Sequence, residues 1–318
     1  MIYNGVFGMA NVVAVIWDFD KTLIDGYMQT PLFKDYNVDE KLFWKEVNEL
    51  PDKYKKMDVQ VNKDTVYLNH LIQYVKDGKM PGLNNDKLKE YGKKQVFYPG
   101  VIDFIKSAQT NLYNSDSSRN YGEYDIKVEH YIVSTGIKKI IEGTELADIV
   151  SGIWGCELID ALVNANTDKK AVKEISEVGY TIDNTTKTRA LFEINKGIPQ
   201  NPDIDVNAKM PEEARRVKFH NMIYIADGPS DIPAFSVINR FGGATFAVYP
   251  KENQAAFDQV EQLREDGRID MYAEANFSKG TTAYMWITHK IKKLADRMYD
   301  MEKSKINSSV SLAPRHLT

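Results

Sequence analysis

The sequence predicts an α/β fold, in which helices cover both faces of a parallel sheet and a helical module is inserted into the chain. Two observations carry this prediction. Continuous apolar, β-branched runs, which are typical of strands in the centre of a parallel sheet, alternate with segments of helical periodicity. Residues 24–96 differ from the rest of the chain, because they show helical patterns and no strand pattern.

Strand patterns recur along the core, with helix patterns between them. The clearest strand is 12–17, a continuous apolar run (VVAVIW). The other expected strands are 127–133, 222–225 and 245–249, and residues 150–186 favour short strands with a hairpin around Asn184. The expected helices are 101–108, 137–146, 187–196, 251–266 and 281–303.

The inserted module favours three helices. The first follows a capping pattern around Asp39 and ends at Pro51. The second begins near residues 62–64 and has Gly78 at its C′ position. The third is rich in lysine and covers about 86–94.

The composition is that of a globular domain, with 43% hydrophobic and 27% charged residues in a chain of 318. The formal net charge of -4 provides no overall basic field for nucleic acid or anionic lipid, so we expect neither as a partner. The apolar runs are too short to span a bilayer, and residues 1–17 lack a signal-peptide pattern. The sequence does not indicate an oligomeric state.

The single cysteine, Cys156, excludes an internal disulfide framework and fits a reducing cytoplasm, which we expect to be the location. Its mixed surroundings favour packing over a role as nucleophile. The five histidines show no metal-ligand spacing.

Polar side chains follow three of the expected strands, at the point where each strand ends. These are Asp18 and Asp20 after the first, Ser134 and Thr135 after the second, and Asp227 and Asp231 after the third. The carboxyl ends of parallel strands meet at one edge of a sheet, where ligands bind. We therefore expect these side chains to converge, with Lys187 added from the start of a helix.

This set of side chains favours phosphoryl transfer. Converging carboxylates repel one another unless a cation lies between them, and ligands that are all oxygen favour Mg²⁺. A hydroxyl and backbone amides at a helix N-terminus, together with a lysine, favour the binding of an anion such as a phosphate group. With Asp18 and Asp20 two positions apart on a strand, one carboxylate can attack phosphorus while the other exchanges protons.

Each cluster alone also has an ordinary structural interpretation. Asp-Phe-Asp and Asp-Gly-Pro-Ser-Asp are good turn sequences, Ser-Thr-Gly can be a helix N-cap, and most lysines are solvated. The four clusters in this order, three of them directly after apolar strands, favour a site over four separate structural details.

The ordered clusters resemble the motifs of the haloacid dehalogenase-like (HAD) hydrolase superfamily. Asp18, Asp20 and Thr22 match its DxDxT motif, and Ser134 matches the serine or threonine that ends the second strand. Lys187 fits the third motif, for which Lys196, Lys169 and Lys170 are rivals. The fourth motif, usually GDGxxD, is matched by 226–231 with Ala226 in place of the first glycine.

The resemblance implies a role for each matched residue. Asp18 would be the nucleophile and a Mg²⁺ ligand, and Asp20 would be the general acid/base and ligate Mg²⁺ through its carbonyl. Asp227 would be the third metal ligand. Ser134, Thr135 and Lys187 would bind the phosphoryl group, with Thr22, Gly228 and Asp231 in support.

The resemblance also implies a Rossmann-like core, 1–23 and 97–306, with 24–96 as a helical cap and 307–318 as a disordered tail. It is strongest to the phosphoserine phosphatase-like branch, which has a helical cap. Those enzymes place a glutamate soon after the first motif to hold the substrate amine. Here Asp25 is the only acid in that stretch and falls about two positions early, so phosphoserine itself is not supported.

The expected function is Mg²⁺-dependent hydrolysis of a small phosphorylated metabolite through an aspartyl-phosphate on Asp18. Phosphotransfer to another acceptor, as in a mutase, and a non-catalytic role in binding a phosphate ligand remain open. Carbon–halogen hydrolysis is disfavoured by Asp20 and Asp227, because dehalogenases of this superfamily lack the second acid and need no metal. A transport ATPase also forms an aspartyl-phosphate, but it would need transmembrane helices. The apolar runs of this sequence are too short for them, so this alternative is disfavoured.

Overall fold

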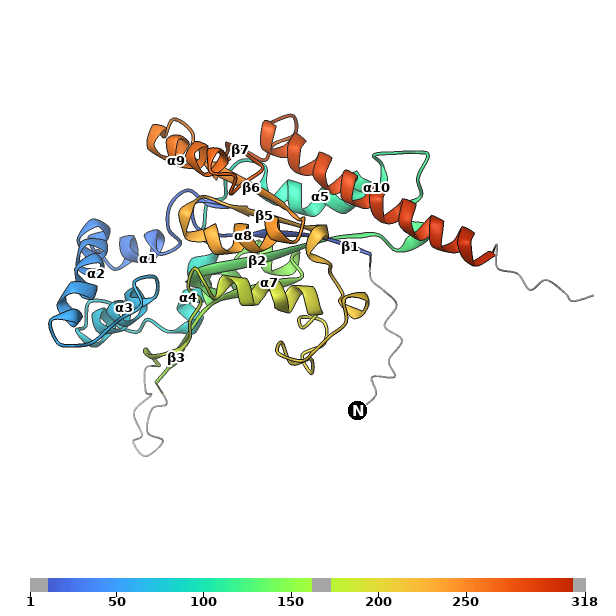
Figure 1. Cartoon of the computed structure of the whole chain (residues 1–318). Helices are drawn as coiled ribbons and strands as arrows, with labels where there is room; N and C mark the ends of the chain where they lie inside the picture. Colours follow the sequence, from blue (N-terminus) through green and yellow to red (C-terminus); the bar gives the residue numbers. More distant parts are fainter. Residues whose placement is uncertain (1–10, 162–172, 311–318) are drawn as a thin grey trace, which may run out of the picture.

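The computed structural model describes residues 11–161 and 173–310. Its centre is a seven-stranded sheet with the order β4-β3-β2-β1-β5-β6-β7 (Figure 1). Neighbouring strands are parallel except for β3 and β4, which pair antiparallel at one edge. The strands are β1 (Val12–Trp17), β2 (Lys127–Ile137), β3 (Gly152–Asp160), β4 (Ile175–Tyr180), β5 (Met222–Ala226), β6 (Ala244–Tyr249) and β7 (Met271–Glu274). The predicted α/β class is confirmed.

Helices cover both faces of this sheet. Alternate residues of β1 belong to different cores, because successive side chains of a strand point to opposite faces. Val13, Val15 and Trp17 pack with α5 (Val101–Tyr113), α6 (Lys138–Glu142) and α10 (Thr282–Val310). Val12, Ala14 and Ile16 pack with α7 (Lys187–Lys196), α8 (Ile232–Arg240) and α9 (Gln254–Glu265). This two-sided burial explains why β1 is apolar throughout.

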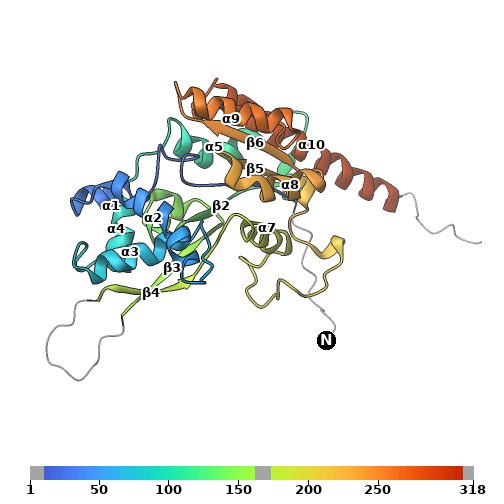
Figure 2. The ribbon, with the colours of Figure 1, turned by 60° about the vertical axis from the view of Figure 1, so that its left-hand side comes forward.

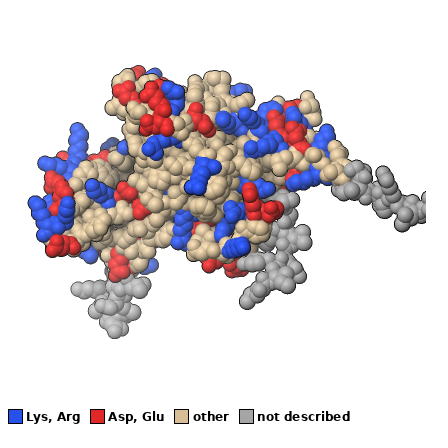
Figure 3. All heavy atoms as spheres, viewed as in Figure 1, with Lys and Arg blue, Asp and Glu red and all other residues tan. Residues whose placement is uncertain are grey.

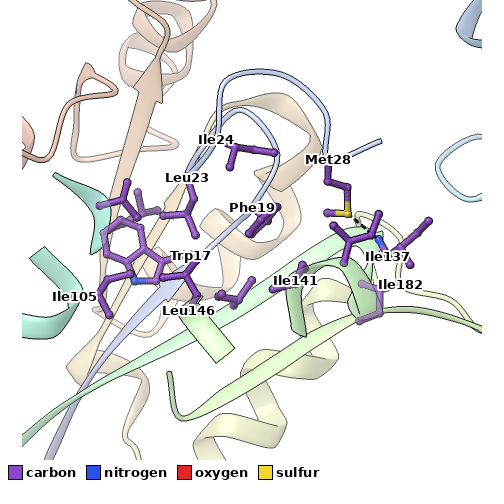
Figure 4. Close-up of a cluster of buried hydrophobic side chains, with 14 of the residues drawn as sticks. Trp17, Phe19, Leu23, Ile24, Met28, Ile105, Ile137, Ile141, Leu146 and Ile182 are labelled. Atoms are coloured by element: carbon purple, nitrogen blue, oxygen red, sulfur yellow. Dashed lines mark hydrogen bonds between the residues drawn. The ribbon is translucent and has the colours of Figure 1, made fainter. Parts of the chain in front are cut away.

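The first core continues from β1 into the loop that follows it. Figure 4 shows Trp17, Phe19, Leu23 and Ile24 packed among isoleucines of β2, α5 and α6. At the end of this loop the Sδ atom of Met28 lies 3.1 Å from the amide nitrogen of Ile137. The loop is therefore anchored on the end of β2, beside the strand from which it came.

Residues 24–96 form a helical segment (Figures 1 and 2). Its helices are α1 (Thr30–Asp35), α2 (Glu40–Lys55), α3 (Val66–Lys76) and α4 (Asn85–Gly92), and no strand of the sheet lies within these residues. The β3–β4 hairpin lies against these helices. The amide of Ile175 donates to the carbonyl of Leu83 at 2.9 Å, and Asn85 Nδ2 donates to the carbonyl of Leu158 at 2.9 Å. The division into core and cap remains a prediction, and these contacts attach the hairpin to the helical side.

Several predicted element boundaries are wrong. Helix α2 continues through Pro51 to Lys55, because the proline removes one backbone hydrogen bond while Tyr54 still packs on the core. Strand β2 runs through Ser134 to Ile137, so α6 is short and begins only at Lys138.

The predicted hairpin around Asn184 is also wrong. The antiparallel partners are β3 and β4, and Asn184 lies in the turn that leads into α7. That turn forms because the Asp183 carboxylate accepts a hydrogen bond from the amide of Thr186 at 2.6 Å.

At the C-terminus, α10 includes residues 307–310, which were predicted as part of a disordered tail, and an i,i+3 ion pair between Lys305 and Glu302 at 2.6 Å supports its last turns. The rest of the predicted tail, 311–318, lies outside the described residues. Helices α1 and α8 and strand β7 were not predicted.

Acidic and basic side chains are interspersed on the face shown in Figure 3. None of the helices within 11–161 and 173–310 combines the length and apolar character needed to cross a membrane.

Candidate active site

The carboxyl ends of β1 and β5 bring Asp18 and Asp227 together. The amide of Asp18 donates to the carbonyl of Ile225 at 2.9 Å, which extends the pairing of the two strands by one residue. Asp227 follows directly after β5. Oxygen atoms of Asp18, Asp227 and Asp231 all lie within 4.8 Å of one another, so the predicted convergence of the first and fourth motifs is confirmed by the geometry.

Lys187 is buried in the middle of this carboxylate cluster. It is the first residue of α7, and its Nζ atom lies 2.7 Å from Asp18 Oδ1 and 2.6 Å from Asp231 Oδ1. Burial opposes the charge of Lys187, but the charges of Asp18 and Asp231 raise its pKa above the ordinary value. Lys187 is therefore a fixed cation at the end of the sheet.

Of the rival lysines, Lys196 lies at the other end of α7, where its Nζ atom donates to the carbonyls of Val206 and Ala208. Lys169 and Lys170 lie outside the described residues. Within the described chain, Lys187 is the lysine that reaches the carboxylates.

Asp231 holds Lys187 in place. Its Oδ1 atom accepts hydrogen bonds from Lys187 and from the hydroxyl of Tyr224 at 2.5 Å, and its Oδ2 atom accepts one from Ser230 at 2.9 Å. Three donors leave this carboxylate well satisfied, which agrees with a supporting position. Gly228 lies in the turn between Asp227 and Asp231, and its role remains a prediction.

Asp20 is held by the loop that follows β1. Its Oδ1 atom accepts a hydrogen bond from the amide of Met28 at 2.9 Å, which closes the loop over a span of eight residues. Thr22 is buried in this loop, but its hydroxyl makes no hydrogen bond to the described residues. Its amide donates to the carbonyl of Phe19 at 3.3 Å, and its role in bracing the loop remains a prediction.

The end of β2 is tied to the helical segment. Ser134 is buried, and its Oγ atom accepts a hydrogen bond from the amide of Gly136 at 2.9 Å. The carbonyl of Thr135 accepts hydrogen bonds from the hydroxyl of Tyr67 at 3.0 Å and from the thiol of Cys156 at 3.3 Å. No hydrogen bond among the described residues joins Ser134 or Thr135 to the carboxylates, so their phosphate-binding roles remain predictions.

Tyr67 was not predicted as a site residue. It projects from α3, is buried, and has its pKa raised by burial and by the nearby charges of Cys156 and Asp20. In the sequence it is one aromatic residue on an apolar helix face, which is the pattern of a core residue. Cys156 packs at the same place, as expected.

Burial and mutual repulsion raise the pKa values of Asp18, Asp227 and Asp20. Burial raises the pKa of Asp18 to about 6 despite the opposing charge of Lys187, and Asp231 adds to the increase. Burial, with the charges of Asp18 and Asp231, raises the pKa of Asp227 to about 7. The pKa of Asp20 is also raised, by burial and by Asp18. Ionised carboxylates so close together need more positive charge than Lys187 supplies.

A hard divalent cation fits this donor set. The carboxylate of Asp227 accepts no hydrogen bond in the described part of the chain, although it lies among like charges. The side chain of Asp20 is engaged with Met28, which is compatible with the predicted use of its carbonyl. With Asp231 satisfied by three donors, Asp18 and Asp227 are the carboxylates left to bind Mg²⁺. The metal ligands remain a prediction.

Asp25 is the acid in the stretch that follows the first motif. It is exposed and accepts a hydrogen bond from the hydroxyl of Tyr98 at 3.1 Å.

No protein-family model matches the sequence. An uncharacterized protein of Borreliella burgdorferi is 38% identical over 293 residues, which cover 88% of this chain and 97% of that protein. Among solved structures, a HAD family hydrolase from Salmonella enterica serovar Typhi is 11% identical with a TM-score of 0.46, covering 83% of this chain and 67% of that one. A phosphoserine phosphatase with a phospho-aspartyl intermediate analogue is 16% identical with a TM-score of 0.45, covering 83% and 93%. By its identity over nearly the full length, the chain belongs to the family of the Borreliella burgdorferi protein, and its assembled motifs resemble those of the HAD hydrolases.

Proposed function

We propose that this chain is a HAD-type, Mg²⁺-dependent phosphatase that hydrolyses a small phosphorylated metabolite through an aspartyl-phosphate on Asp18. One observation carries the proposal. Asp18 is buried at the end of β1 and contacts the ammonium of Lys187, while Asp227 lies beside it and Asp20 is held two residues further on. A nucleophile, a proton carrier and positive charge are the parts that phosphoryl transfer needs.

In the first step, a carboxylate oxygen of Asp18 attacks phosphorus. A new bond forms between that oxygen and phosphorus, and the bond from phosphorus to the oxygen of the leaving group breaks. Asp20, in its protonated form, gives its proton to that oxygen, so the leaving group departs as an alcohol. The raised pKa of Asp20 suits this role as a proton donor.

In the second step, water attacks the phosphorus of the aspartyl-phosphate. Asp20 is now a carboxylate and takes a proton from the water, while the bond between phosphorus and Asp18 breaks. Inorganic phosphate leaves, and both side chains return to their starting states. Lys187 neutralises charge on the phosphoryl oxygens in both steps, and the hydroxyl of Ser134 donates a hydrogen bond to one of these oxygens.

Mg²⁺ bound by Asp18, Asp227 and the carbonyl of Asp20 would neutralise charge on the transferring group and allow the carboxylates to be ionised together. Closure of the helical segment over the site would exclude water other than the one that reacts. The hydrogen bond from Tyr67 to the carbonyl of Thr135 supports this closed arrangement.

Transfer to an acceptor other than water is the second candidate, because the same nucleophile and cations serve both reactions. Purified protein is therefore tested against a panel of phosphomonoesters with Mg²⁺ and then with EDTA, with phosphate release and phosphorylated products both measured. Phosphate release that depends on the metal supports the proposal. A new phosphoester without free phosphate favours transfer. Release that EDTA leaves unchanged contradicts the metal-dependent mechanism.

A further inference from the structure

Lys21, the residue after Asp20, has a strained backbone. Its φ is 57°, in the left-handed region where glycine is accommodated at least cost. The conformation is imposed by the loop, since the amide of Lys21 donates to the carbonyl of Gly26 at 3.0 Å. Glycine would satisfy this turn more easily than lysine, so the strain points to a use for the side chain.

The ammonium of Lys21 is held by a tyrosine. Its Nζ atom donates to the hydroxyl of Tyr27 at 2.9 Å and lies 4.3 Å from the centre of that ring, but Lys21 forms no ion pair with the described residues. Lys187, in contrast, contacts two carboxylates. The site therefore has a second cation, and the hydrogen-bond partner of its ammonium within residues 11–161 and 173–310 is a neutral phenol.

This second cation directly follows the proposed proton carrier in the chain. Lys21 comes after Asp20, and its side chain is only partly buried. A lysine ammonium is positively charged at neutral pH. Lys21 therefore adds a positive charge to the loop that holds Asp20, and this charge is within reach of solvent.

Tyr27 connects Lys21 to an open groove. The ring of Tyr27 packs against that of Trp44 on α2, with 4.9 Å between the ring centroids. Both residues line an open groove of about 900 Å³ along this helix. Trp44 in turn lies 5.7 Å from Tyr67, whose hydroxyl binds the end of β2. This row of aromatic rings supports Tyr27, and with it the ammonium of Lys21 that Tyr27 binds.

We infer that Lys21 binds a second anionic group, carried on the leaving part of the substrate, so that the site selects phosphomonoesters that bear a carboxylate or a further phosphate. The inference rests on the proposed function and adds a substrate class to it. A carboxylate or phosphate oxygen is a stronger partner for an ammonium than a phenol, because the hydrogen bond is then charged on both sides. Lys187 serves the transferring phosphoryl group, and Lys21 serves the group on the other side of the ester.

The test compares esters that differ in the charge of the leaving group: 2-phosphoglycolate, fructose 1,6-bisphosphate, glycerol 3-phosphate and phosphoethanolamine. The measured quantity is the ratio of kcat/KM for each acidic ester to that for glycerol 3-phosphate. In Lys21→Met this ratio is expected to fall about 10- to 100-fold, the equivalent of one charged hydrogen bond. Lys21→Arg should retain most of the ratio. The two acidic esters distinguish a carboxylate from a phosphate as the recognised group.

Lys41→Met is the matched control, because Lys41 lines the groove, whereas the hydrogen bond to the hydroxyl of Tyr27 comes from Lys21. Its ratio is expected to match that of wild type. An equal fall of the kcat/KM ratio in both variants would mean that any positive charge along the groove has the same effect, and would overturn the inference. If Lys21→Met does not fold, Tyr27→Phe removes the hydrogen bond that places the ammonium and should lower the same ratio.

Failure of the inference can be separated from failure of the proposed function. Hydrolysis of glycerol 3-phosphate by wild type, with no preference for acidic esters, would overturn the inference and leave the phosphatase in place. No hydrolysis of any ester would count against the proposed function. Calorimetric titration with 2-phosphoglycolate then decides the inference: binding lost in Lys21→Met supports it, and equal binding in both proteins overturns it.

Discussion

The Nζ atom of Lys187 lies 2.7 Å from Oδ1 of Asp18, and both side chains are almost wholly excluded from solvent. A buried charge is costly unless it is paired, and among the described residues Lys187 is the lysine that forms ion pairs with Asp18 and Asp231 of this carboxylate cluster. The pair therefore serves two purposes. It favours the ionised form of Asp18, the proposed nucleophile, in a dry environment, and it places a positive charge where the proposed mechanism needs one.

Replacement of Lys187 by Met should destabilise the protein, because buried carboxylates lose their partner. We expect a loss of about 3–5 kcal/mol in the free energy of unfolding at pH 8. The loss should be smaller at pH 5.5. Without Lys187 the pKa of Asp18 rises further above its unfolded value, so the folded state takes up protons more readily and gains stability as the pH falls. Urea unfolding at both pH values measures this, with exposed Lys45→Met as control. Equal losses at the two pH values would contradict the buried pair.

Asp18→Asn should abolish turnover and leave the fold intact. The amide retains the shape of the carboxylate and its distance to Lys187 but cannot attack phosphorus. We expect less than about 1% of wild-type kcat/KM on any hydrolysed ester. Circular dichroism checks the fold, and mass spectrometry checks that asparagine has not deamidated. Activity of more than a few per cent in undamaged protein would exclude Asp18 as the nucleophile.

Asp20→Asn tests the proton carrier with little change of structure, because an asparagine oxygen can still accept the amide of Met28. We expect turnover to fall about 10²–10⁴-fold. With p-nitrophenyl phosphate, whose leaving group needs little protonation, the loss should be concentrated in breakdown of the aspartyl-phosphate. Acid-quenched single turnovers should then show the phosphorylated protein accumulating. An unchanged breakdown rate would remove Asp20 from this role.

His130 should make stability depend on pH. Its Nδ1 atom accepts the indole N–H of Trp17 at 3.1 Å, its Nε2 atom has no partner among the described residues, and burial lowers its pKa to about 3. Between that value and the unfolded value of about 6.5, only the unfolded chain binds the proton, so stability falls as the pH falls. We expect His130 to cost about 2 kcal/mol of stability between pH 7 and pH 5.

The comparison with His130→Gln isolates this effect. Glutamine can accept the same indole N–H but does not titrate, and the carboxylates contribute equally to both proteins. Urea unfolding in EDTA should therefore show the difference between the two proteins shifting by about 2 kcal/mol in favour of the variant. A difference that is the same at pH 7 and pH 5 would show that His130 can be protonated in the folded state.

The sequence by itself determined the α/β class and most members of the site. Strand β1 could be predicted because burial on both faces demands an apolar residue at every position from Val12 to Trp17. The acidic pairs could be predicted because they follow such strands directly, and the carboxyl ends of parallel strands share one edge. These are local patterns, and each is written in a few consecutive residues. Boundaries at Pro51 and Ile137 were wrong, because packing extended those elements beyond their local signals.

The tertiary structure alone decided which residues touch. Lys187 and Asp18 are 169 positions apart, and their contact follows from the sheet order, which places β1 between β2 and β5 and leaves α7 against that end of the sheet. The same holds for Tyr67, which reaches Thr135 across 68 positions. Lys21 and Tyr27 are close in sequence, but the structure was needed to show the left-handed backbone of Lys21 and the hydrogen bond from its ammonium to the Tyr27 hydroxyl. Spacing along a chain specifies strands and turns, whereas contacts between distant side chains depend on how the whole core packs.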